Sequence, residues 1–132
     1  MKMLLPSRAV RKLVTQELEL FYSSNDLWRF TVAVSLLVQF YKVKMPVIEW
    51  VIELDSGASL GKTNEDGVIQ LIIPGKHWLK QVEDIHGNSP DVWIKVFFHE
   101  WWHYMVWVDE EEKADEFAEK LFMSNKETPN DA

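Results

Sequence analysis

The sequence predicts one α+β domain, with helices towards both ends of the chain and a small β-sheet between them. Two segments with helical apolar spacing precede a β-branched stretch, and two further helical segments follow it. The 132 residues, of which 47% are hydrophobic, are enough for one compact core and too few for two ordinary domains. We therefore place the domain at residues 1–123 and expect the polar tail, residues 124–132, to be disordered.

The first helix is predicted from a capping signal and a periodic apolar face. Ser7 follows Pro6 as a candidate N-cap, and the helix is expected to continue to about Tyr22. The apolar positions spaced by three and four are Val10, Leu13, Val14, Leu18 and Phe21.

A second helix is predicted after a break at residues 23–26, whose Ser, Asn and Asp residues end one helix and cap the next. From Leu27 to about Tyr41 the sequence is apolar almost all round, which favours a buried helix. A strand is the alternative there, because β-branched residues such as Val32 and Val34 are frequent.

The middle of the chain predicts two or three strands. Residues 47–54 are rich in β-branched side chains, and residues 58–62 are a candidate for a short second strand. The Asn-Glu-Asp-Gly segment at residues 64–67 predicts a hairpin turn into a strand at residues 68–73. That last strand is our candidate for the one nearest a cleft, where an extended peptide could add by main-chain hydrogen bonds, with ordinary sheet pairing as the alternative.

The last third of the chain predicts two helices after a loosely ordered segment. Residues 76–90 mix polar and turn-forming residues and are expected to be a partly ordered connection. Ser89 is a candidate cap for a helix that ends within Met105–Trp107, and Asp109 is a candidate cap for a final helix at residues 110–123.

Composition narrows the classes of function. The net charge is −7, from 14 Lys and Arg against 21 Asp and Glu, so we expect no nucleic-acid partner. No export signal is recognisable, and the most apolar stretch, residues 30–38, is too short to span a bilayer, so we expect a cytoplasmic protein without a membrane partner. The sequence contains no Cys, so a metal ion would have to bind to His and carboxylate side chains.

One motif points to metal chemistry, the segment His99-Glu100-Trp101-Trp102-His103. Residues four apart share one face of a helix, so His99 and His103 can bind a single ion while Glu100 lies beside it. This His-Glu-x-x-His arrangement is typical of zinc peptidases, in which the Glu is the general base. The plainer interpretation is a pair of ordinary core histidines.

The last predicted helix offers carboxylates to complete such a site. Its apolar positions are Ala114, Ala118, Leu121 and Phe122, and the same periodicity places Glu111 and Asp115 on the inward face. A buried face with two unpaired acids is explained if Glu111 is the third metal ligand and Asp115 accepts the spare N–H of a ligand histidine.

Other assignments stay open at this point. Asp115 replaces Glu111 as the ligand if the first site helix continues to Trp107, because only seven residues separate His103 from Glu111. Further possibilities are Glu110 or Glu112 as ligand, no third ligand, or a closed structural site that includes His77 or His86. Candidate donors for stabilising an oxyanion are His77, His86 and Tyr104.

The two motifs together resemble those of a known enzyme group. The run Glu111-Glu112-Lys113-Ala114-Asp115 resembles the Glu-x-x-Ala-Asp signature after the zinc helix of gluzincins, and residues 111–118 are similar to the corresponding helix of ImmA/IrrE-type metallopeptidases and minimal archaeal gluzincins. The resemblance covers residues 96–122. It implies a zincin-like fold with one zinc ion per chain, in which Glu111 is the third ligand and Asp115 supports a histidine.

The sequence thus predicts a zinc-dependent metallopeptidase, active or latent, that hydrolyses peptide or protein substrates with Glu100 as general base. The alternative is a catalytically silent interaction or regulatory module of the same fold, with a structural metal or none.

Overall fold

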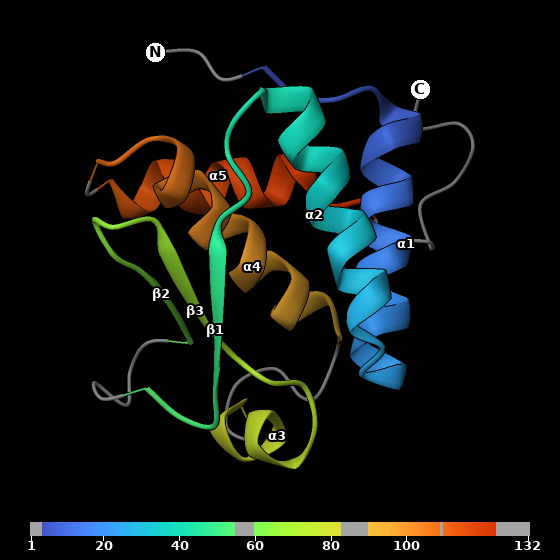
Figure 1. Cartoon of the computed structure of the whole chain (residues 1–132), viewed down its shortest axis with the longest axis vertical. Helices are drawn as coiled ribbons and strands as arrows, with labels where there is room; N and C mark the ends of the chain where they lie inside the picture. Colours follow the sequence, from blue (N-terminus) through green and yellow to red (C-terminus); the bar gives the residue numbers. More distant parts are fainter. Residues whose placement is uncertain (1–3, 55–59, 83–89, 109, 124–132) are drawn as a thin grey trace.

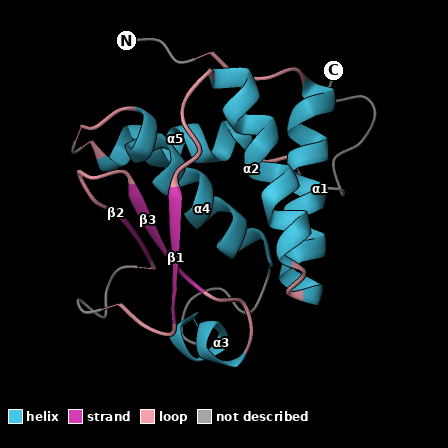
Figure 2. Cartoon of the chain, in the orientation of Figure 1, coloured by secondary structure: helices cyan, strands magenta, loops and turns pink. Residues whose placement is uncertain are grey.

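The computed structural model describes residues 4–54, 60–82, 90–108 and 110–123, and this part of the chain is α+β, as predicted (Figure 1). Two antiparallel neighbouring helices pack on one side, a small sheet lies on the other, and a long helix passes between them (Figure 2). The elements are α1 (Arg8–Ser24), α2 (Leu27–Tyr41), β1 (Val47–Val51), β2 (Gly61–Thr63), β3 (Val68–Ile72), α3 (Lys76–Val82), α4 (Pro90–Met105) and α5 (Glu111–Leu121).

The residues that cap α1 and α2 behave as predicted. The Ser7 hydroxyl accepts a hydrogen bond from the Val10 N–H at 3.2 Å. Asn25 ends α1 in the left-handed conformation with φ 58°, and the Asp26 carboxylate accepts from the Trp28 N–H at 3.1 Å. Residues 27–41 are therefore helical, and the strand alternative is wrong.

The sheet has the order β1-β3-β2, with β1 parallel and β2 antiparallel to β3. The hairpin turn is confirmed, because the Asn64 side chain accepts hydrogen bonds from the N–H groups of Asp66 and Val68, and Gly67 has φ 82°. Since β3 is the central strand, the expectation that residues 68–73 border the cleft is wrong. The strand at that edge is β2.

Two sequence predictions of local structure need correction. Residues 76–82 form the short helix α3 instead of a connection, because Trp78 and Val82 lie one turn apart and are both fully buried. The final helix begins at Glu111, and Glu110, at its N-cap, makes no side-chain capping bond. Ser89, Asp109 and the tail after Met123 lie outside the described residues.

The core holds α4 in a fixed position between the two layers. Its Trp93 contacts an aromatic cluster, and the Trp93 indole N–H donates to the Ile72 carbonyl of β3 at 2.8 Å in the interior. The rings of that cluster are Phe21, Phe30, Trp50, Trp93 and Phe97. Because α4 is packed against both layers, side chains on its remaining face are presented by a rigid support. Among the described residues, no helix has the length and apolar character to cross a membrane.

Candidate metal centre

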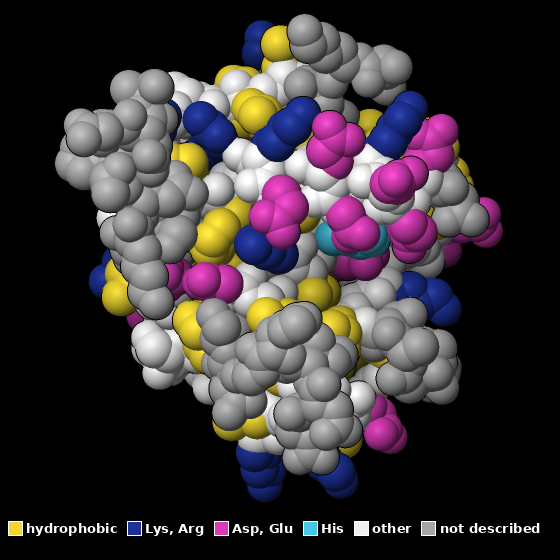
Figure 3. Space-filling model, turned by 180° about the vertical axis from the view of Figure 1, so that it is seen from behind, with side chains coloured by type: hydrophobic (Ala, Val, Ile, Leu, Met, Phe, Trp, Pro, Cys, Tyr) yellow, Lys and Arg dark blue, Asp and Glu magenta, His cyan; other side chains and the backbone are white. Residues whose placement is uncertain are grey.

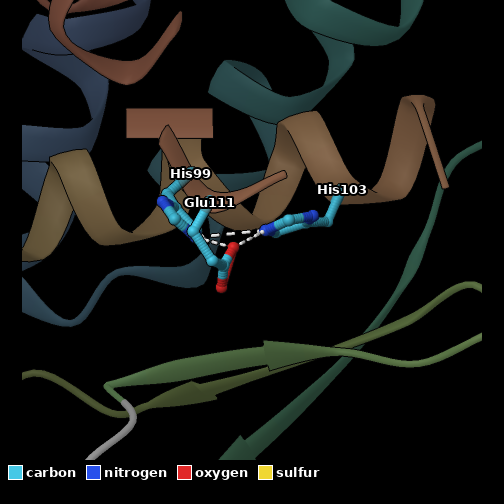
Figure 4. Close-up of side chains that lie close together, drawn as sticks. All are labelled: His99, His103 and Glu111. Atoms are coloured by element: carbon cyan, nitrogen blue, oxygen red, sulfur yellow. Dashed lines mark hydrogen bonds and ion pairs between the residues drawn. The ribbon is translucent and has the colours of Figure 1, made fainter. Parts of the chain in front are cut away.

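His99 and His103 project from one face of α4 toward the same point, as their spacing predicts (Figure 4). Their Nε2 atoms are 3.1 Å apart, and their side chains are only 16% and 12% exposed. The two rings therefore meet at a partly exposed point on α4 and are not ordinary core histidines.

Glu111 completes the group from the first residue of α5. One of its carboxylate oxygens, Oε2, lies 2.6 Å from His103 Nε2 and 3.2 Å from His99 Nε2. Helix α4 ends at Met105, within a turn of His103, and this early end lets α5 return to the histidines. His99, His103 and Glu111 are close enough to bind a single metal ion.

The hydrogen bonds around the two rings test whether a cation suits this position. The Val108 carbonyl, which can only accept, is 3.2 Å from His103 Nδ1, and the Asp115 carboxylate is 2.7 Å from His99 Nδ1. A neutral ring with its proton on Nδ1 satisfies each of these acceptors and directs the lone pair of Nε2 toward Glu111. Three lone-pair donors converge, and their separations approach the spacing of about 3.3 Å between neighbouring ligands of a tetrahedral zinc ion.

The carboxylates of α5 are not buried, contrary to prediction. Side-chain exposure is 64% for Glu111 and 74% for Asp115. Helical periodicity correctly gave the direction of these side chains, since both contact histidines, but α5 begins at the rim of the domain where its acids remain in contact with solvent. The predicted apolar face is confirmed, with Ala114, Ala118, Leu121 and Phe122 buried together with Phe117.

Glu100 lies beside the three donors and is the most buried acid among the described residues. Its Oε1 accepts a hydrogen bond from the Thr63 hydroxyl at 2.9 Å, and its Oε2 lies 3.9 Å from His99 Nε2. Burial raises the pKa of this carboxyl, while the Thr63 hydrogen bond and the nearby histidines lower it and Glu111 raises it further. A carboxyl with an elevated pKa next to a metal site is suited to accept and release a proton.

A cleft extends on both sides of these residues. A hollow of about 390 Å³ lies toward His103, with Lys62, Trp107 and Val108 in its wall. A second hollow of about 680 Å³ lies toward His99, and its wall includes the apolar residues Leu60, Val92 and Val96. Both hollows include Gly61, Glu100 and Glu111, so the site lies where they meet.

The surface around the histidines is strongly acidic. Seen from behind, exposed histidine lies within a group of Asp and Glu side chains, with basic side chains also next to this group (Figure 3). The acids of the group include Glu111 and Asp115. This concentration of negative charge favours a cation over an anion at the site.

The other sequence candidates lie elsewhere. Tyr104 donates its hydroxyl hydrogen to the Lys44 carbonyl, and His77 is in α3, at the end of the sheet away from α5 (Figure 1). Glu110 pairs with Lys113 at 3.0 Å, and His86 lies outside the described residues. The structure therefore brings Glu111 to the Nε2 atoms of both histidines, and Asp115 contacts the opposite ring nitrogen, Nδ1, of His99.

Sequence reasoning missed two residues of the site, Gly61 and Thr63 of β2. Both contact Glu100: Thr63 by its hydroxyl, and Gly61 by close approach. No local pattern indicates them, because their place opposite α4 depends on the order of strands in the sheet.

No protein-family model, curated protein or solved structure matches the chain. The functional inference therefore depends on the geometry of the site.

Proposed function

We propose that the protein is a zinc-dependent metallopeptidase. The observation that carries the proposal is the convergence of two histidine Nε2 atoms and a Glu111 oxygen within 3.2 Å of one another, next to the buried carboxyl of Glu100. Two imidazoles and one carboxylate are a ligand set that suits zinc in a catalytic site, where a fourth position stays open. In this protein the fourth position would face the cleft.

His99, His103 and Glu111 would hold the ion, and Asp115 and the Val108 carbonyl would keep the two rings in the required tautomer. When bound, zinc supplies a Lewis acid that lowers the pKa of a water molecule and polarises a peptide carbonyl. Glu100 takes a proton from the attacking water through Oε2, the oxygen that faces the histidines. It then passes the proton to the leaving amine.

The β2 edge offers a place for the peptide main chain. Because the Asn64 N–H donates to the Val68 carbonyl, and hydrogen-bonded pairs alternate in an antiparallel ladder, Lys62 pairs with β3 through its main chain while Gly61 and Thr63 do not. The N–H and C=O groups of Gly61 and Thr63 therefore point away from β3. An extended peptide can add there as a fourth strand, along the cleft and past Glu100.

The proposal is tested with zinc-loaded protein and a pool of internally quenched peptides of mixed sequence. We expect the wild type to cleave some of these peptides, and Glu100→Gln to lose about 10²- to 10⁴-fold in rate while it keeps its zinc. Glu112→Gln, an exposed neighbour of the ligand, is the matched control and should cleave normally. Cleavage by Glu100→Gln at the wild-type rate would show that the assigned mechanism is wrong, and an inactive zinc-loaded wild type would count against a peptidase.

A further inference from the structure

We propose that Thr63 is a positioning residue that ties substrate placement to the general base: its side chain orients Glu100, and its main chain pairs with the peptide. The inference rests on the proposed peptidase function. It adds the residue that fixes the distance between the bound peptide and the general base, Glu100.

The Thr63 hydroxyl lies 2.9 Å from Glu100 Oε1 and 3.0 Å from the main-chain carbonyl oxygen of Glu100. Its single O–H hydrogen is shared between these two acceptors, so the hydroxyl contacts both the carboxyl end and the helix backbone of one residue. Within the described part of the chain, Thr63 supplies the hydroxyl that donates to Oε1 of Glu100. The other carboxylate oxygen, Oε2, faces His99. A buried carboxyl on three rotatable bonds needs such a contact to keep one orientation.

Gly61 lets the strand come close enough for that contact. A Cβ at this position would lie 2.9 Å from Glu100 Cγ and 3.0 Å from Val96 Cγ1, both closer than carbon atoms normally approach. The β2 backbone therefore packs directly on the methylene group of Glu100, while Thr63, two residues along the same face, holds the carboxyl. The strand contacts the base at both of these points.

The same two residues present their main-chain groups to the cleft, because the ladder uses those of Lys62. A peptide that pairs with Thr63 is thereby placed at a fixed register relative to Glu100. One strand residue sets both the position of the scissile carbonyl and the direction of the base.

Thr63→Val tests the side-chain role, because it replaces the hydroxyl by a methyl group and leaves the strand main chain unchanged. With a quenched peptide that the wild type cleaves as substrate, we expect kcat of Thr63→Val to fall about ten- to a hundredfold. Its KM should stay within about twofold of wild type, and its zinc content should be unchanged. Thr63→Ser, which restores the hydroxyl, should recover most of kcat. Thr31→Val, which removes a hydroxyl on an exposed face of α2, is the matched control and should have no effect.

A second readout does not require hydrolysis. In protein labelled with ¹³C-glutamate, the side-chain carboxyl resonance of Glu100 is the one missing from Glu100→Gln. We expect it to shift in zinc-loaded Thr63→Val and to return toward its wild-type position in Thr63→Ser.

The two readouts separate the two proposals. If the zinc-loaded wild type cleaves no peptide but the resonance shifts, the peptidase proposal fails and the orienting contact stands. An unchanged resonance in folded Thr63→Val overturns the role of Thr63 whether or not the wild type cleaves peptides. With an active wild type, a kcat that is unchanged in Thr63→Val, or that is not restored in Thr63→Ser, also overturns it.

Discussion

The two halves of the candidate site differ sharply in how they are held. On the α4 and β2 half, the side chains of His99, Glu100 and His103 are 16%, 10% and 12% exposed. On the α5 half, the side chains of Glu111 and Asp115 are 64% and 74% exposed, and their partners are the imidazoles themselves. Packing therefore defines the first half, whereas charge and hydrogen bonds define the second.

The position of α5 as a whole does not depend on those acids. Its other face packs into the core through Ala114 and Leu121, and Arg11 of α1 donates to the Lys120 carbonyl near its end at 2.8 Å. The helix is therefore anchored at its back, and among the described residues the side chains of Glu111 and Asp115 have their hydrogen bonds with His99 and His103. We infer that a bound ion would join the two halves.

Metal removal should have the largest effect. An ion that binds only the folded protein, present at about a thousand times its Kd, adds roughly 4 kcal/mol to the free energy of unfolding. For a chain of this size, a chelator should then lower Tm by on the order of 10–20 °C relative to the zinc-loaded protein, measured by calorimetry. The Tm of His103→Ala should not respond to chelator. An equal Tm for wild type with and without chelator would mean that no ion links the halves.

A change at the tight contact of the packed half comes next. Gly61→Ala places a methyl group against Glu100 and Val96, which should cost about 1–3 kcal/mol in the stability of the metal-free protein. Chemical denaturation measures this cost. Adding Val96→Ala should recover part of it by making room, and a Gly61→Ala protein as stable as wild type would show that β2 is not pressed against α4.

An exposed acid should behave in the opposite way. Asp115→Ala leaves His99 Nδ1 without its carboxylate, and we expect a ten- to hundredfold loss of zinc affinity, measured by competition with a chelating dye. Because Asp115 is largely exposed, the unfolding free energy of the metal-free protein should change by less than about 0.5 kcal/mol. Glu112→Ala is the control with no expected effect on either quantity. A large loss of stability in metal-free Asp115→Ala would contradict the claim that the exposed half contributes to metal binding and not to folding.

The smallest effect is expected on the outer surface of α5. Lys120 and Glu116 form an exposed ion pair at 3.1 Å, one helical turn apart. Lys120→Ala should lower the free energy of unfolding by no more than about 0.5 kcal/mol and leave zinc affinity unchanged. Thermal unfolding and the dye competition measure both, and a loss of zinc affinity would extend the site beyond the residues assigned to it.

These differences follow what the sequence could and could not predict. Helix caps and apolar spacing are local, so the bounds of α1 and α2 and the convergence of His99 with His103 were predictable. Periodicity also gave the direction of Glu111 and Asp115. It did not give their exposure, which depends on how far α5 lies from the centre of the domain.

Features that depend on contacts distant in sequence were not predictable from local patterns. The strand order makes β2 the edge strand, and it alone places Gly61 and Thr63 against Glu100. Helix α3 was missed because Trp78 and Val82 stand among polar residues, and only their burial shows why the segment is helical.

The central claim is that His99, His103 and Glu111 form one zinc site across the two halves. Elemental analysis of protein purified without chelator, dialysed against zinc and then against buffer, tests it most directly. The account predicts about one zinc per wild-type chain, about one in Glu100→Gln, and almost none in His103→Ala or Glu111→Ala. A wild type without zinc, or a Glu111→Ala protein that keeps its full zinc content, would contradict it.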